Sequence, residues 1–288
     1  MAELPRPNPV EVRPVVSRPD FATIGGLVLA LGGILGGLLL EGGKIRDVAQ
    51  ITAACIVFGG TFGAVLVTTP FPVLSRAVRK LHYVFIERAQ HPNQAIEEII
   101  SFAAKARKHG IVSLEHDADN IPDHFLRKAL SLAVDGTDLD VLRRIMDLEI
   151  NMDEHRAEAE AKVCESAGGY APTVGIIGAV LGLIQVMKHL ENIDEVGRGI
   201  AVAFVATIYG VGSANLFFLP AANKLRARLR RETQIKELKL EGVVAIVEGL
   251  NPKLIRTKLE AYAREAATAD RPVPKAVAGR TAQDSNAT

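Results

Sequence analysis

The sequence contains no tryptophan, only two cysteines and few aromatic residues, which make up 5% of the chain. Cys55 lies in an apolar run, and Cys164 lies in a mixed stretch. Neither cysteine has the spacing to a histidine that metal ligands require, and two cysteines do not build a disulfide framework. We therefore expect two buried free thiols and no metal site.

The chain also lacks an excess of charge of either sign. Its 34 Lys and Arg residues against 33 Asp and Glu residues give a net charge of +1, which provides no global attraction to nucleic acid. We find no nucleophile–base set, metal cluster or phosphate-binding loop. The sequence therefore predicts neither an enzyme nor a cofactor-dependent protein.

Apolar residues are abundant: 48% of the chain is hydrophobic and the mean hydropathy is +0.18, although 23% of the residues are charged. The charges must therefore be separated from the apolar segments. Four apolar runs are each long enough, at 1.5 Å per residue, to cross the ~30 Å hydrocarbon core of a membrane. They cover residues 21–40, 48–69, 170–187 and 199–219. The runs predict four membrane-spanning helices.

The flanks of these runs predict their orientation. Positive residues follow the second run at Arg76, Arg79 and Lys80, and five more follow the fourth run between residues 224 and 231. The two short loops, around residues 41–47 and 188–198, carry balanced charge. Because positive residues stay on the cytoplasmic side, we expect both termini and the polar block to be cytoplasmic. The N-terminus has no cleavage site of the signal-peptide kind, so the first run is expected to stay as an anchor.

No span contains a carboxylate, a lysine or an arginine. Charged groups inside a membrane usually mark ion relays, so their absence argues against a pump that works alone. The polar groups that remain are hydroxyls and amides, which cannot hold a proton at neutral pH. If ions cross here, the titratable group must come from a partner.

Small residues recur at helical spacing in all four runs, for example at Gly32 and Gly36, at Gly59 and Gly63, and at Gly175 and Gly182. Small residues let helices approach closely where no hydrophobic effect drives association. These stripes pack either against other spans of the same chain or against another subunit, and the sequence leaves both readings open.

Several motifs resemble a known family. PTVGIIGAVLGLIQVM and GRGIAVAFVATIYGVGSANLFFLP, in the third and fourth runs, resemble the MotA/TolQ/ExbB proton-channel superfamily. ARKHGIVSLE at residues 106–115 is similar to the rotor-facing motif of flagellar stator A subunits, the MotA/PomA family. DLEINMDEHR at residues 147–156 also matches that family. The resemblance covers residues 20–262.

The resemblance implies a stator subunit that couples proton flow across the inner membrane to torque. Its partners would be a B subunit of the MotB/PomB type, with a titrating aspartate and a peptidoglycan-binding domain, and the rotor protein FliG. Copies of the A subunit would form a homo-oligomeric ring, a pentamer, around a B dimer in the lipid bilayer. The alternative is an ExbB/TolQ-like subunit that energises an outer-membrane or envelope machine.

The implied fold class is an all-α membrane protein, with four transmembrane helices and a large helical cytoplasmic domain between the second and the third. We expect six segments. They are a cytoplasmic N-terminal segment at 1–20, a first transmembrane hairpin at 21–69, a rotor-interacting domain at 70–168, a channel-lining hairpin at 169–220, a cytoplasmic helical tail at 221–267 and a disordered tail at 268–288.

The resemblance also implies individual roles. Arg107 and Glu115 match the charged pair that engages the rotor, and Lys108 is adjacent to it. Because Gly110 separates Arg107 from Glu115, we expect them on different elements. The channel residues implied are Pro172, Thr173, Ala179, Phe204, Thr207, Tyr209 and Pro220.

The residue at position 179 bears on the choice of ion. Sodium-type members of the family carry a threonine seven residues after the first channel proline, and this sequence has Ala179 there. Because a methyl group cannot ligate sodium, the sequence favours protons. Thr173, Thr207 and Tyr209 still offer oxygens. Pro172 lacks an N–H, so it either begins a helix at the membrane edge or kinks one that must shift.

Overall fold

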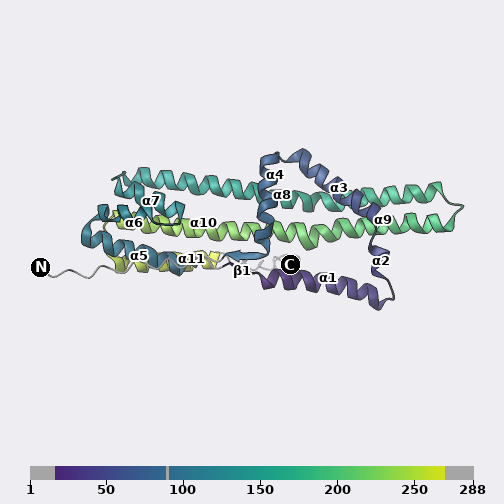
Figure 1. The fold of residues 1–288 in the computed structure, drawn as a ribbon, viewed down its shortest axis with the longest axis horizontal. Coiled ribbons are helices and arrows are strands. Elements are labelled where there is room, and N and C mark those ends of the chain that lie inside the picture. The colour runs from purple at the N-terminus through teal and green to yellow at the C-terminus, as the bar shows by residue number, and fades with distance from the viewer. Residues whose placement is uncertain (1–16, 89–90, 270–288) are drawn as a thin grey trace, which may run out of the picture. The chain divides into compact units, whose positions relative to one another are not determined.

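The computed structural model describes residues 17–88 and 91–269, and nearly all of them are helical (Figure 1). The chain divides into two compact units. We call residues 17–88 and 147–233 the apolar unit, and residues 91–146 and 234–269 the polar unit. Two of the expected segments lie mostly outside the described residues. They are the N-terminal segment 1–20, of which residues 1–16 are not described, and the disordered tail 268–288, of which residues 270–288 are not described.

The first half of the apolar unit is a series of helices that follow the first two apolar runs. A pair of three-residue strands, β1 and β2, is antiparallel, with Pro19 opposite Ile86, and is a small addition to the predominantly helical fold that the sequence predicts. The elements are β1 (Ser17–Pro19), α1 (Phe21–Leu40), α2 (Ile45–Val48), α3 (Ile51–Thr68), α4 (Phe71–Lys80), the 3₁₀ helix η1 (Leu81–Val84) and β2 (Ile86–Arg88).

The second half of the apolar unit is built on two long helices. The helix α8 (Leu139–Lys188) runs without a break from the charged sequence through the third apolar run. The fourth run forms α9 (Ile193–Ser213), the π-helical turn η3 (Ala214–Phe218) and the start of α10 (Leu219–Val247). Both α8 and α10 contribute residues to both units.

Pro172 lies inside α8 and not at its start, so the first of the two readings, a proline that begins a helix, is wrong, and the reading of a proline within a helix remains. The reason is that the charged segment before it, rich in Ala and Glu, is itself strongly helical and continues into the span.

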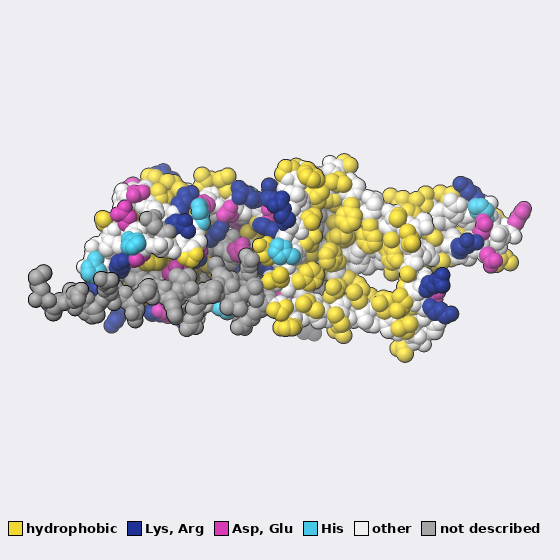
Figure 2. All heavy atoms as spheres, viewed as in Figure 1, with side chains coloured by type: hydrophobic (Ala, Val, Ile, Leu, Met, Phe, Trp, Pro, Cys, Tyr) yellow, Lys and Arg dark blue, Asp and Glu magenta, His cyan; other side chains and the backbone are white. Residues whose placement is uncertain are grey.

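Four helices of the described residues are long and apolar enough to cross a membrane, by length and composition. Hydrophobic side chains dominate the surface of α1, α3 and α9, and charged side chains gather at the loop between α8 and α9 (Figure 2). Cys164 is buried as expected, but Cys55 is exposed on α3. The expectation for Cys55 is wrong because none of the described residues covers its side of α3.

The polar unit is a helical cluster around an apolar core. Its helices are α5 (Pro92–His109), η2 (Ile111–Leu114), α6 (Glu115–Asp119), α7 (His124–Val134), α11 (Pro252–Ala269) and the ends of α8 and α10. The apolar positions at helical spacing on α5, such as Ile96, Ile99 and Ala103, are buried. The largest fully buried side chains include Ile99, Leu126, Leu130, Leu238 and Leu259.

Candidate functional site

The third and fourth apolar runs meet through a seam of small residues. A Cβ placed on Gly182 of α8 would lie 2.8 Å from the backbone N of Ala203 on α9. A Cβ placed on Gly178 would lie 2.7 Å from the side chain of Ala206. Only glycine permits so close an approach of two backbones. For α8 and α9 the small-residue stripe therefore packs within the chain.

The glycines of α1 behave differently. A Cβ added at Gly25, Gly32 or Gly36 would meet nothing within 4 Å, and α1 has no buried residue. A Cβ added at Gly63 on α3 would also meet nothing within 4 Å, although α3 itself packs on α9. The two readings left open by the sequence therefore divide between the helices. The stripes of α8 and α9 are used inside the chain, and that of α1 is open.

Two further faces of α8 and α9 carry the residues that the resemblance implicates. On α9, Phe204 is 69% exposed and Thr207 is half-buried beside Gly175, whose Cβ position lies 3.5 Å from Thr207 Cα. On α8, Pro172 and Ala179 are half-buried two turns apart. Each pair lies on one helical face.

The same two faces include apolar residues that sequence reasoning missed. Ile176 and Leu183 continue the face of Pro172 and Ala179, and Ile200 and Val211 continue the face of Phe204 and Thr207; all four are exposed. The spacing of three, four and seven residues from the implicated positions could have identified them. Each helix therefore presents a smooth apolar wall with few polar atoms.

The hydroxyl groups on these helices are mostly engaged by nearby carbonyls. Thr207 Oγ1 donates to Ala203 O at 3.1 Å, and Thr173 Oγ1 donates to Tyr170 O at 2.8 Å. Thr173 is exposed. A hydroxyl that donates to a carbonyl still keeps lone pairs as acceptors. Both oxygens could therefore meet a passing proton donor or cation.

Tyr209 lies apart from that wall. Its hydroxyl donates to Val48 O at 2.6 Å and accepts the N–H of Gln50 at 3.2 Å. Its ring stacks on Phe58 of α3 at 6.0 Å between centroids. These contacts hold the link between α2 and α3 against α9. In this structure Tyr209 therefore positions that link.

Pro220 follows a local change of helix type. Within η3 the N–H of Leu219 bonds to Ala214 O, five residues back, and Pro220 has no N–H to offer to the carbonyl of residue 216. A π-turn next to a proline loosens the backbone hydrogen-bond ladder and marks a place where the helix can bend. Pro220 itself is exposed.

A belt of ion pairs lies just beyond the apolar part of these helices. Arg226 of α10 binds Glu165 of α8 through Nη2 at 2.5 Å and Glu158 through Nε at 2.8 Å. These two carboxylates, Glu165 first, raise the pKa of Arg226, and the Arg226 hydrogen bonds lower the pKa of Glu165. Glu160, 1% exposed, binds Arg76 at 3.2 Å and Lys80 at 2.7 Å. The belt fastens α4, α8 and α10 to one another.

The charged motif of the polar unit lies at a helix break. Arg107 and Lys108 are exposed in the last turn of α5, and Glu115 is exposed as the first residue of α6, so their placement on different elements is confirmed. Gly110 between them has φ +83°, a conformation that favours glycine. Leu114 is fully buried and anchors the turn. The charges therefore stand on a rigid, solvent-facing corner.

Among the described residues, no group of three or more His, Cys, Asp or Glu side chains is placed to hold a metal ion.

Comparison with known proteins shows which family the chain resembles. Residues 117–238 match the MotA/TolQ/ExbB proton channel family, and residues 24–110 match the Motility protein A N-terminal family. Motility protein A of Bacillus subtilis is 36% identical over 84% of this chain and 90% of that protein. Two solved structures are also similar. The flagellar MotAB stator complex from Bacillus subtilis has a TM-score of 0.79 and 34% sequence identity, and the match covers 86% of this chain and 99% of that chain. The structure of C. jejuni MotAB has a TM-score of 0.80 and 30% sequence identity, and the match covers 84% of this chain and 95% of that chain.

Proposed function

Because the chain belongs to the Motility protein A family, we propose that the exposed walls of α8 and α9 line the path of the ion in a flagellar stator. Members of this family are ion-channel subunits of the stator, and this chain is one of them, in the inner membrane. The ExbB/TolQ-like alternative is not favoured, because the N-terminal match is to motility proteins.

One observation carries the proposal: the four apolar runs, residues 21–40, 48–69, 170–187 and 199–219, hold no carboxylate, lysine or arginine. A proton cannot cross such a wall without a titrating group, and the only oxygens on the wall belong to groups such as Thr207 and Thr173. The group is therefore supplied by a B subunit of the MotB/PomB type, through an aspartate on its membrane helix. The solved relatives are themselves complexes of two kinds of subunit by their names, MotAB.

We further propose that copies of this chain form a pentameric ring around a B dimer, with both termini on the cytoplasmic side. Basic residues after the second and fourth spans support this orientation, since Arg76, Lys80, Lys224 and Arg228 would all lie in the cytoplasm. The open glycine face of α1 and the exposed walls of α8 and α9 offer surfaces for neighbours.

The charged corner at Arg107, Lys108 and Glu115 is proposed as the contact with the rotor protein FliG. Exposed charges steer rapid association and release, which suits a contact that is made and broken at every step. The domain limits given above, from the rotor-interacting segment 70–168 to the channel-lining hairpin 169–220, belong to the same proposal.

The test is reconstitution in vesicles under a membrane potential with a pH-sensitive dye inside. This chain alone is expected to give no voltage-driven proton flux. Co-assembly with the B subunit, freed of any inhibitory segment, is expected to give flux that disappears when the aspartate of the partner becomes asparagine. Robust flux from this chain alone would overturn the proposal.

A further inference from the structure

The most exposed large hydrophobic side chain in the described part of the polar unit lies on the turn of the charged corner. Val112 is 63% exposed, against 54% for Leu254 and 36% for Val141. It belongs to η2, which joins the end of α5 to the start of α6. A single exposed valine is ordinary on a protein surface. Val112 differs from the other two because it stands between Arg107 and Glu115 on the element that connects them.

The charges on either side of Val112 are not used inside the polar unit. Arg107, Lys108 and Glu115 are exposed, and no hydrogen bond or ion pair within the described residues engages their side chains. Lys105 and Asp117, by contrast, pair with each other at 2.5 Å and tie α5 to α6. One pair of charges therefore fastens the turn, and the outer charges remain available to a partner.

The turn that carries Val112 is held from within. The side chain of Leu114 is fully buried. The carbonyl of Gly110 accepts the Ser113 hydroxyl at 2.7 Å and the Ser113 N–H at 3.2 Å. A valine side chain is also stiff at χ1. A side chain that is fixed before binding loses less entropy when a partner covers it, so Val112 is a preorganised contact.

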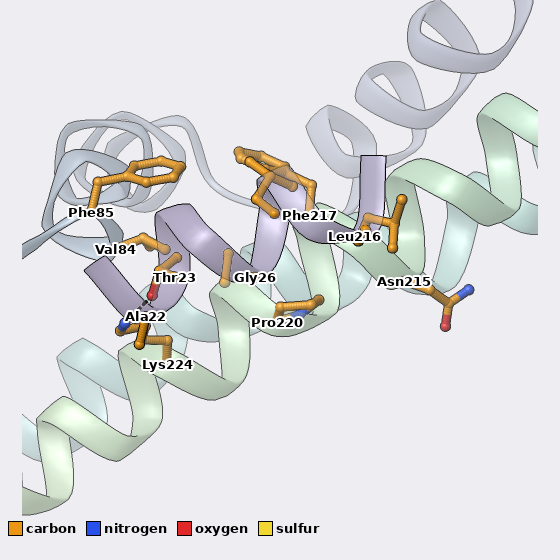
Figure 3. Close-up of a pocket in the computed structure, with 13 residues that line it drawn as sticks. Ala22, Thr23, Gly26, Val84, Phe85, Asn215, Leu216, Phe217, Pro220 and Lys224 are labelled. Atoms are coloured by element: carbon orange, nitrogen blue, oxygen red, sulfur yellow. Dashed lines mark hydrogen bonds between the residues drawn. The ribbon is translucent and has the colours of Figure 1, made fainter. Parts of the chain in front are cut away.

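The cavity of about 330 Å³ in the apolar unit offers no comparable surface (Figure 3). Its lining is mostly apolar, and the ammonium of Lys224 donates to the Asp20 carboxylate and to the Thr23 hydroxyl. The cation and the carboxylate of the cavity therefore neutralise each other, which leaves little charge to select a ligand. The corner around Val112 differs because its outer charges are unpaired.

Exposed charges alone would hold a partner at the corner only weakly. Exposed ion pairs add little affinity and act mainly on the rate of association. A stator transmits torque, so its contact with the rotor must hold under load. Protein interfaces gain strength from an apolar centre that is shielded from water by a polar rim. Val112 has the position of such a centre, with Arg107 and Glu115 as the rim.

We infer that Val112 is the apolar centre of the rotor contact, and that it packs against an apolar side chain of FliG flanked by an acidic and a basic group. The acidic group would face Arg107 and Lys108, and the basic group would face Glu115. The inference rests on the rotor contact proposed above. It adds the side chain that gives this contact its strength.

Binding of purified FliG to the whole stator complex, this chain with its B subunit, measures the contribution of Val112. Val112→Thr keeps a side chain branched at Cβ and replaces one methyl group by a hydroxyl. We expect the Kd to rise about fourfold, the factor for one buried methyl group. Val141→Thr, the same change at an exposed valine of the same unit, is the matched control and should leave the Kd unchanged. Both variants should keep the wild-type melting temperature, since both side chains are exposed.

A photoreactive side chain tests the same contact in living cells. Val112→benzoylphenylalanine is expected to crosslink this chain to FliG on illumination, whereas Val141→benzoylphenylalanine is not. The crosslink does not depend on measuring a weak equilibrium, so it decides the matter even where FliG binds the purified complex too loosely for a Kd. No crosslink from position 112 to FliG would overturn the inference.

The results separate this inference from the proposals on which it rests. If Arg107→Glu weakens FliG binding and Val112→Thr does not, the rotor contact stands and the apolar centre is excluded. If neither variant weakens binding and position 112 gives no crosslink, the rotor contact at this corner fails as well. Neither measurement involves ion flow, so the channel proposal is tested independently.

Discussion

Gly175 of α8 and Gly210 of α9 pack backbone against backbone. A Cβ on Gly210 would lie 3.0 Å from Gly175 Cα and 2.5 Å from Ala171 O, and a Cβ on Gly175 would lie 3.2 Å from Gly210 Cα. The contact lies beside Thr207. Any side chain added here must therefore push apart the two helices that carry the channel wall.

Gly210→Ala is expected to destabilise the stator complex by about 1–3 kcal/mol, because overpacking at a backbone contact forces the helices to separate. Gly212→Ala, two residues along α9, is the matched control. Its Cβ would meet nothing within 4 Å, and alanine is the better helix former. Thermal unfolding of the purified complex compares the two variants, and an equal melting temperature would contradict the packing described for α8 and α9.

The buried carboxylate of Glu160 is expected to matter more than its neighbours on α8. Glu160→Ala leaves Arg76 and Lys80 without their shared partner. Because both cations are partly exposed and can turn to water, we expect a loss of about 2 kcal/mol, less than for a fully buried pair. Glu158→Ala should cost under about 1 kcal/mol, since Glu158 is only half-buried and Arg226 keeps Glu165. Denaturation of the two variant complexes side by side measures both losses of stability, and the loss for Glu160→Ala must be larger than the loss for Glu158→Ala.

The pH dependence of the polar unit is expected to involve Asp123. Its carboxylate caps α7 by accepting the N–H groups of Phe125 and Leu126, at 2.9 and 3.1 Å, and pairs with the buried Lys239. Burial raises the pKa of Asp123, but the hydrogen bond and charge of Lys239 and the two N–H groups outweigh it, so the pKa is lowered. The stabilisation is then present above the unfolded value, about 3.9, and is lost as the pH falls through the folded value.

Asp123→Asn keeps a capping oxygen but removes the charge opposite Lys239. We expect a loss of about 1–3 kcal/mol at pH 7 and a weaker further loss on acidification below about pH 4. Asp138→Asn is the control, because Asp138 caps the start of α8 from an exposed position. Melting temperatures across a pH series are the measurement. An unchanged acid dependence in Asp123→Asn would assign the effect to other groups.

The sequence predicted the spans and the charged corner well, because both depend on local patterns. Uninterrupted apolar runs predict membrane helices, and Gly110 indicates the helix break between Arg107 and Glu115. The sequence could not say which glycine stripe packs inside the chain. That depends on which helices are neighbours, and α3 lies against α9 while α1 stays open. The same missing information explains the exposed Cys55.

Other features could not be predicted from the sequence, because competing local preferences or contacts between distant residues decide them. Pro172 suggests a helix start, but the helical sequence before it carries α8 through the proline. The π-turn η3 has no signal in composition, although Pro220 behind it gives a physical reason for one. In the sequence Tyr209 is one of the hydroxyl groups that could line a channel. Its hydrogen bonds to Val48 and Gln50 join residues about 160 positions apart, so only the structure reveals them.

Reversing the charges of the exposed corner is expected to stop rotation without harming assembly. Arg107→Glu and Glu115→Lys change solvent-facing groups, so the fold should lose no more than about 0.5 kcal/mol. Arg144→Glu, an exposed change on α8 in the same unit, is the control. Swimming in soft agar and co-purification with the B subunit are the two readouts. Normal swimming by both corner variants would exclude a rotor contact at this place.

The ion that drives the motor is expected to be the proton, and the wall of α8 and α9 gives the reason. Ala179 offers only a methyl group, and the neighbouring exposed residues Ile176 and Leu183 offer none of the oxygens that a dehydrated sodium ion requires. Swimming speed should therefore survive replacement of sodium by potassium and fall to zero with a protonophore. Dependence on sodium would contradict this reading of position 179.

Thr207 is the oxygen on that wall whose removal should matter most. Its hydroxyl donates to Ala203 O and keeps lone pairs as acceptors, and Thr207 lies three residues after the exposed Phe204, on the same side of α9. Thr68 on α3 donates to Ala64 O in the same i−4 manner and serves as the matched control. Because the local bond is equivalent, Thr207→Ala and Thr68→Ala should cost similar stability. Only Thr207→Ala should slow the rotation of small beads attached to flagellar stubs, a low-load measurement in which ion transfer limits speed. Equal speeds in the two variants would show that the Thr207 hydroxyl serves its own helix alone.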